Sequence, residues 1–261
     1  METVIPTTST VLSSLLRADF TTQWRNRRSV IITLIVPVII LMSWKGLIGV
    51  VGGAFVLANS ITIGLFASGL MGYSNSVARD RDKGIFQRLR VAPTPSWAIM
   101  ASRLIVQLAM LVIISTVVFI IGKNYDGITL TPSAYFFTYI TAVICGAVAL
   151  SLGQMIVGFI KSPETVNSTT RLVYLALILI GMFGEINHAI NLRRNQGPSQ
   201  LSDMLYNAAH WSPYGTVKTV LVTSMNPPTW DNHTTGALLL TLLYTLLFTT
   251  FGIKWFKWNS K

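Results

Sequence analysis

Apolar residues in this chain occur in long runs without charge rather than in short alternating segments. Because a helix needs about 20 mostly apolar residues to cross about 30 Å of hydrocarbon, each run is a candidate span once its flanking residues are included. The runs cover residues 30–44, 54–77, 104–122, 132–160, 172–184 and 234–253. The pattern therefore predicts an all-α, polytopic membrane protein with six transmembrane helices, forming a single domain over residues 1–261.

Two segments outside these runs are predicted to be helical without crossing the membrane. Ahead of the first run, apolar side chains recur at helical spacing within residues 1–28, with Arg17, Arg25 and Arg28 on the other side. This pattern predicts an N-terminal helix in the inner membrane interface, with a solvated helical arm as the alternative. Residues 185–232 form a polar outer segment, in which two short helices are predicted before the last span; the pattern leaves open whether they are re-entrant.

The composition is typical of a membrane protein, and the charges are unevenly placed. Only 11% of the residues are charged, whereas soluble domains average about 25%. The net charge is +11, and 15 of the 20 Lys and Arg residues fall on one side of the predicted topology. Cationic residues gather on the cytoplasmic side of membrane proteins, so we expect a multi-pass protein of the plasma membrane with both termini in the cytoplasm. This placement explains the positive charge without nucleic-acid binding.

The segment between the second and third runs carries the densest charge. Residues 79–83 read Arg-Asp-Arg-Asp-Lys, and Ile85, Phe86 and Leu89 then form an apolar ridge before Pro93 ends the helix. We refer to residues 78–93 as the charged segment. A short helix with an apolar ridge and charged flanks suits docking into a groove of a partner protein, and a solvated loop between spans is the alternative.

The charged segment resembles the corresponding loop of a known family, the permease subunits of type-2 ATP-binding-cassette (ABC) exporters, including drug-resistance permeases. In that family the loop after the second span typically reads Arg-Glu-Arg-Glu-x-Gly-Thr, then an apolar residue, two polar residues and Leu, and it ends at a Pro. The matching residues here are Arg79, Asp80, Arg81, Asp82, Gly84, Leu89 and Pro93. Asp80 and Asp82 stand in place of Glu, and Ile85 in place of Thr. The six-span plan and the stretch from His210 to Tyr214 are also similar to the family.

The resemblance implies a mechanism and a set of partners. Two permeases, either identical or close homologues, would pair in the lipid bilayer, and the charged segment of each would act as a coupling helix on a separate nucleotide-binding ATPase subunit. The chain has no Gly-x-x-x-x-Gly-Lys-Ser/Thr motif, so ATP would be bound by that partner. By itself the chain would be neither an enzyme nor a binder of a cofactor. The residues expected to contact the ATPase are Arg79, Asp80, Arg81, Asp82, Gly84, Ile85, Phe86 and Leu89.

Polar residues within or beside the spans are candidates for the substrate pathway. The candidates are Asn59, Gln154 and Glu185, although hydrogen bonds between helices, or a polar cap on a helix, would use the same side chains. No metal is assigned, because the three histidines lack ligand spacing and cysteine partners are absent. The sequence does not indicate which substrate is transported.

Two other classes of function remain as alternatives. An ATP-independent secondary transporter or channel is disfavoured because the span interiors hold almost no ionisable residues, which argues against proton coupling. A membrane-embedded enzyme is disfavoured because no catalytic constellation is visible in the sequence.

Overall fold

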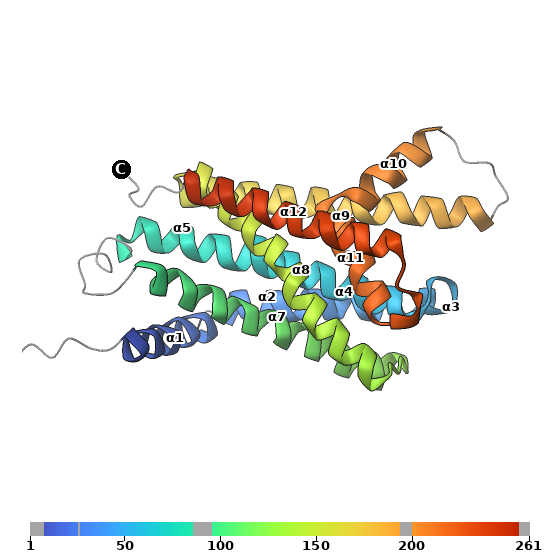
Figure 1. Ribbon diagram of the computed structural model, residues 1–261, viewed down its shortest axis with the longest axis horizontal. Helices are drawn as coiled ribbons and strands as arrows, with labels where there is room; N and C mark the ends of the chain where they lie inside the picture. The colour runs from blue at the N-terminus through green and yellow to red at the C-terminus, as the bar shows by residue number, and fades with distance from the viewer. Residues whose placement is uncertain (1–7, 26, 86–95, 194–199, 256–261) are drawn as a thin grey trace, which may run out of the picture.

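The computed structural model describes residues 8–25, 27–85, 96–193 and 200–255, and these residues are almost entirely helical. Most of the helices run along the long axis of one bundle (Figure 1). The helices are α1 (Thr8–Arg25), α2 (Arg27–Ser43), η1 (Lys45–Leu47), α3 (Ile48–Val51), α4 (Gly53–Phe66), η2 (Ala67–Tyr73), α5 (Ser74–Asp82), α7 (Ser96–Asp126), α8 (Pro132–Phe159), α9 (Pro163–Arg193), α10 (Gln200–Trp211), α11 (Pro213–Ser224), η3 (Pro227–Thr229) and α12 (Asn232–Lys254). The predicted all-α fold is confirmed for the described residues.

Four helices in the described part of the chain are long and apolar enough to cross a membrane, and a bent pair is a fifth candidate. The four cover Gly53–Asp82, Ala101–Asp126, Pro132–Phe159 and Asn232–Lys254. The bent pair joins Thr33–Ser43 to Lys45–Val51 at an angle of 43°. By length and composition, the described residues therefore support four or five of the six predicted spans. The remaining predicted span falls on α9.

The continuous helix formed by α4, η2 and α5 is the centre of the bundle. Every residue from Val56 to Leu70 is buried. By contrast, α12 packs on α8 and has exposed leucines on its surface, such as Leu239 and Leu246. A helix that is apolar all round and buried belongs in the core, and an exposed apolar face in a membrane protein is suited to lipid. The buried helix thus occupies the core, and α2, α7, α8 and α11 pack against it.

Several helices begin where the sequence supplies a cap. The side chains of Thr131, Ser212 and Asp231 each accept a hydrogen bond from the backbone N–H three residues later. Proline follows Thr131 and Ser212 at the first helical position, where its missing N–H costs nothing. These caps fix the starts of α8, α11 and α12.

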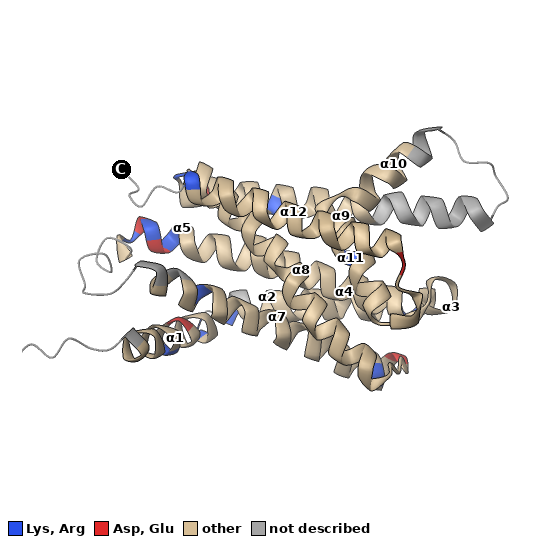
Figure 2. Cartoon of the chain, in the orientation of Figure 1, with Lys and Arg blue, Asp and Glu red and all other residues tan. Residues whose placement is uncertain are grey.

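The charged residues gather at one end of the bundle. Figure 2 shows Lys, Arg, Asp and Glu concentrated where α5 ends at Asp82 and α12 ends at Lys254, and, among the described residues, few at the end where α7 reaches Asp126. We call the first the charged end and the second the opposite end. The asymmetry expected from the sequence is therefore present in three dimensions.

The N-terminal helix α1 packs against α7 at the charged end (Figure 1). Its predicted apolar face is divided: Val11 is buried, whereas Phe20 and Trp24 are exposed and stack on each other with ring centroids 6.1 Å apart. The helix thus has one face on the protein and an aromatic pair that the protein does not cover.

The outer segment differs in two respects from its sequence-based description. Helix α9 continues nine residues past the predicted start of the segment at residue 185 and ends at Arg193. Two helices of 12 residues each then precede α12, as predicted, but the second is inside the bundle: α11 packs on α4, α8 and α12, and Tyr214, Val217 and Leu221 are fully buried. A helix of 12 residues is about 18 Å long, which is too short to cross the bilayer.

Candidate functional site

Helix α5 presents the charged segment at the charged end of the bundle. The helix ends at Asp82, the N–H groups of Lys83 and Gly84 bond to the carbonyls of Arg79 and Arg81, and Gly84 has φ +66°. A residue in this left-handed conformation just beyond a helix is most often Gly, because a Cβ would be strained there. Gly84 therefore stops α5 and redirects the chain at Ile85, which is half-buried. Phe86 and Leu89 lie outside the described residues.

Arg81 faces into the protein and binds the end of another helix. Its guanidinium donates to the carbonyl oxygens of Val157 at 2.8 Å, Ile160 at 2.6 Å and Lys161 at 2.8 Å, and the residue is 1% exposed. These carbonyls lie at or just beyond the C-terminus of α8, where backbone acceptors lack partners within the helix and the helix dipole is negative. A buried cation is therefore compensated by three charge-assisted hydrogen bonds.

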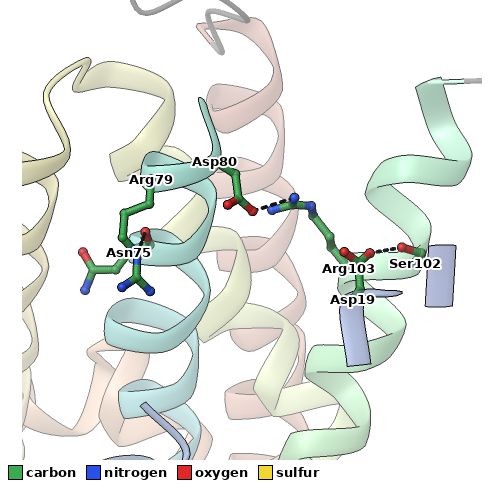
Figure 3. Close-up of polar contacts among 6 residues, drawn as sticks. All are labelled: Asp19, Asn75, Arg79, Asp80, Ser102 and Arg103. Carbon is green, nitrogen blue, oxygen red and sulfur yellow. Dashed lines mark hydrogen bonds and ion pairs between the residues drawn. The ribbon is translucent and has the colours of Figure 1, made fainter. Parts of the chain in front are cut away.

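Asp80, the residue before Arg81, also binds another helix of the chain. Its carboxylate forms an ion pair of 2.7 Å with Arg103 of α7, and the two side chains are only 17% and 10% exposed (Figure 3). Ion pairs in this partly dry setting are screened less than surface pairs, and losing one partner leaves a costly charge behind. The pair ties the base of the charged segment to α7.

A second polar contact extends this connection to α1. Ser102, adjacent to Arg103, donates a hydrogen bond to the carboxylate of Asp19 on α1 (Figure 3). Burial raises the pKa of Asp19, while the Ser102 hydrogen bond and the charge of Arg103 oppose that rise. A cavity of about 30 Å³ lies between α1, α5 and α7, with Gln107 and Tyr73 in its lining. A polar space of this size can hold about two water molecules.

Within residues 78–85, the described part of the charged segment, the exposed residues are Arg79, Asp82 and Lys83. The Nε of Arg79 donates at 3.2 Å to the carbonyl of Asn75 one turn earlier (Figure 3). Asn75 in turn donates at 3.4 Å to Asn167 on α9. Residues 79–83 therefore divide into two that bind other helices, Asp80 and Arg81, and three that are open to solvent.

Asn59 and Gln154, two of the predicted pathway residues, each bind a tyrosine on another helix. Asn59 on α4 accepts a hydrogen bond of 2.6 Å from the Tyr214 hydroxyl, and Gln154 on α8 accepts one of 2.8 Å from the Tyr73 hydroxyl. Asn59 and Tyr73 are separated along one helix by about 21 Å at 1.5 Å per residue. Both amides therefore link helices, which is the alternative use that the sequence left open. Glu185 lies in α9, and its side chain is outside the described part of the structure.

Sequence reasoning missed the contribution of Asp19, Ser102 and Arg103. Asp19 stands in the sequence as an isolated acidic residue of the N-terminal helix, and Arg103 is one of the 15 basic residues on one side of the predicted topology. The available signal was that Asp19 is the one acidic residue among residues 11–28 of the predicted N-terminal helix and that Arg103 borders a charge-free run at the same predicted membrane face. Only the packing of α1 on α7 shows that they belong to one cluster.

The fold and the charged end together define a polytopic helical membrane protein with a charged, internally anchored segment at one end. Comparison with known proteins narrows this class. The model of the ABC-2 type transporter family matches residues 10–188, and the chain belongs to that family. It is also similar to the "Putative transport permease YvfS" of Bacillus subtilis (strain 168), with 23% identity over 201 residues that cover 75% of this chain and 74% of the relative.

The family agrees with the resemblance noted in the sequence, and the protein is therefore a membrane transport permease of the ABC-2 type. The matched range contains the whole charged segment together with Asp19 and Arg103. The cluster around the base of the charged segment thus lies within the part of the chain that matches the family model.

Proposed function

We propose that this chain is the permease subunit of an ATP-driven ABC exporter. It would form the substrate pathway as a dimer, with a second copy or a close homologue, and couple to a separate ATPase subunit through residues 79–93. The observation that carries the proposal is the anchoring of the charged segment: Asp80 and Arg81 bind α7 and α8, so a force applied to the segment would reach helices that cross the membrane.

The division of the segment into bound and open residues supports separate roles for them. Asp80 and Arg81 would hold the segment to the permease, because their side chains are used within the chain. Arg79 and Asp82 would be available to the ATPase, because they are exposed. The predicted apolar contact through Ile85, Phe86 and Leu89 would then seat in a groove of the ATPase.

The proposed topology has six spans with both termini in the cytoplasm of the plasma membrane. The bent pair of α2 and α3 would be the first span and α9 the fifth, since α9 is 31 residues long and packs beside α5. The charged end would face the cytoplasm, as the positive-inside rule requires. The exposed pair Phe20 and Trp24 on α1 would lie in the inner membrane interface, where aromatic rings are favoured.

The proposal is tested first by purification from native membranes. A nucleotide-binding ATPase should co-purify with the tagged chain, and ATP hydrolysis by the complex should depend on the permease. Recovery of a transport-competent chain without any ATPase would favour the ATP-independent class instead.

The docking role of the charged segment is tested with two substitutions. Asp82→Arg and Phe86→Ala should each lower permease-dependent ATP hydrolysis, because one reverses an exposed charge and the other removes apolar contact area. Lys123→Glu, a charge reversal at the opposite end, is the control and should leave hydrolysis unchanged. If both test variants assemble and hydrolyse ATP like the wild type, residues 79–93 are not the docking element.

A further inference from the structure

Arg81 connects two parts of the chain that the proposed function would need to move together. It belongs to the turn of α5 that carries the charged segment, and its guanidinium reaches carbonyls 76 to 80 positions further along the chain. Those carbonyls surround the connection between α8, which ends at Phe159, and α9, which begins at Pro163. One side chain thus bridges the charged segment to the turn between two membrane helices.

The geometry of the contact is suited to transmitting a displacement. The guanidinium is planar and presents several donors in a fixed arrangement, so three hydrogen bonds from one group restrict both its position and its orientation. Arg81 is 1% exposed, so water does not compete for the acceptors. A lysine at this position would keep the charge but offer a single ammonium group, which cannot reproduce the fork.

Other polar contacts of the charged segment, and of the helical turn before it, are made with α7 and α9. Asp80 leads to α7 through Arg103, and Asn75 reaches α9 one turn earlier through a longer contact of 3.4 Å. Among the hydrogen bonds of the described residues, those of Arg81 are the ones that join the charged segment to the end of α8. The turn of residues 160–162 therefore has a direct mechanical connection to the segment.

We infer that Arg81 is a positioning residue of the transport cycle, which carries movement of the charged segment to the α8–α9 turn. This inference rests on the proposed function, because the movement is supplied by the ATPase that binds the segment. In this route, displacement of residues 82–85 moves residues 157–163 through the guanidinium of Arg81. A role in stability alone would place the same hydrogen bonds in the structure but would not make the turn respond to ATP.

Hydrogen exchange in the assembled complex tests the route without a known substrate. The permease with its co-purified ATPase is compared with and without ATP and vanadate, and amide exchange is followed in residues 82–93 and 157–163. In the wild type both regions should change on nucleotide binding. In Arg81→Lys the change in 82–93 should persist, whereas the change in 157–163 should fall several-fold. Arg171→Met, which removes an exposed arginine of α9, is the matched control and should behave like the wild type.

Two results would overturn the inference. The first is a nucleotide response of residues 157–163 that is the same in Arg81→Lys as in the wild type. The second is a wild-type complex in which 82–93 responds and 157–163 does not. Failure of the wild-type chain to bind any ATPase is a different result, since it refutes the proposed function before the route is examined.

A second measurement retains Arg81 and so avoids any folding defect of the variant. Lys83→Cys and Lys161→Cys, both at exposed positions, are introduced together and joined by a flexible bismaleimide. Residue 83 lies within the proposed docking element, so the control is the same double variant with both cysteines capped by a monofunctional maleimide. If the segment and the turn move as one body, the cross-linked complex should hydrolyse ATP at the rate of the capped complex. Slower hydrolysis in the cross-linked than in the capped complex would show that the two parts must separate, which contradicts the inference.

Discussion

At the scale of single residues, the four consecutive charged residues 79–82 differ in their environment: two are exposed to solvent and two face the protein interior. Arg79 and Asp82 are exposed, while Asp80 and Arg81 face α7 and the end of α8. Successive residues of a helix point about 100° apart, so a run of charges cannot all face one way. Burying Asp80 and Arg81 is tolerated because each has a partner. Asp80 forms an ion pair with Arg103, and Arg81 donates hydrogen bonds to backbone carbonyls.

The ion pair between Asp80 and Arg103 gives a prediction at this scale. Asp80→Asn and Arg103→Met should each lower the free energy of unfolding, because each removes the opposite charge of the ion pair from a mostly buried partner. The double variant should lose less than the sum, with a coupling energy of about 0.5–3 kcal/mol in a double-mutant cycle. Unfolding in detergent measures all four proteins. Asp82→Asn is the exposed control and should stay within about 0.5 kcal/mol of the wild type. Strict additivity would show that the pair contributes no interaction energy.

At the scale of elements, the contact between η2 and α8 depends on the absence of side chains. Residues Ala67–Tyr73 form a π-helical stretch in the middle of the central helix, and Gly69 lies there against the backbone of Ala149. Gly153, one turn further along α8, meets the carbonyl of Gly69. Membrane helices use small residues for such close approach, because packing replaces the hydrophobic effect as the source of association.

Gly153→Ala tests this close approach. An added Cβ would lie 2.5 Å from the Gly69 carbonyl oxygen, so the helices must separate, at a cost of about 1–3 kcal/mol for overpacking. Gly236→Ala on α12 is the matched control, since nothing lies within 4 Å of a Cβ there. In the control the better helix propensity of Ala should stabilise by about 0.5–1 kcal/mol. Thermal unfolding in detergent measures both, and equal effects of the two substitutions would contradict the packing argument.

At the scale of the whole molecule, the distribution of charge is the strongest constraint on orientation. The charged end collects the basic residues of α1, α5 and α12, while the opposite end holds few charges among the described residues (Figure 2). Moving this end across the bilayer would require burying many cations, which is costly. The bundle should therefore insert with the charged end in the cytoplasm.

Cysteine labelling tests the orientation. Lys83→Cys at the charged end and Lys123→Cys at the opposite end are each treated with a membrane-impermeant maleimide on intact cells. Residue 123 should react at once and residue 83 only after permeabilisation. The native Cys145 is buried and should give little background. Reaction of residue 83 in intact cells would refute both the orientation and the docking role of the charged segment.

The sequence by itself determined the helical class, the charged segment and the side on which charge collects. These follow from local chemistry, because a bilayer requires long apolar helices and disfavours charge within them. The charge-free runs predicted most helices well, but α9 continues to Arg193 because helical hydrogen bonds do not require an apolar sequence.

Only the tertiary structure decided what each polar side chain does. Nothing in the sequence indicates that Arg81 meets carbonyls near residue 160, that Ser102 binds Asp19, or that Tyr214 binds Asn59, because these partners are brought together by packing across at least 76 positions. In a helical bundle, the rotation and depth of each helix are set by its neighbours as well as by its own residues. That is the physical reason the charged segment could be found in the sequence while its anchors could not.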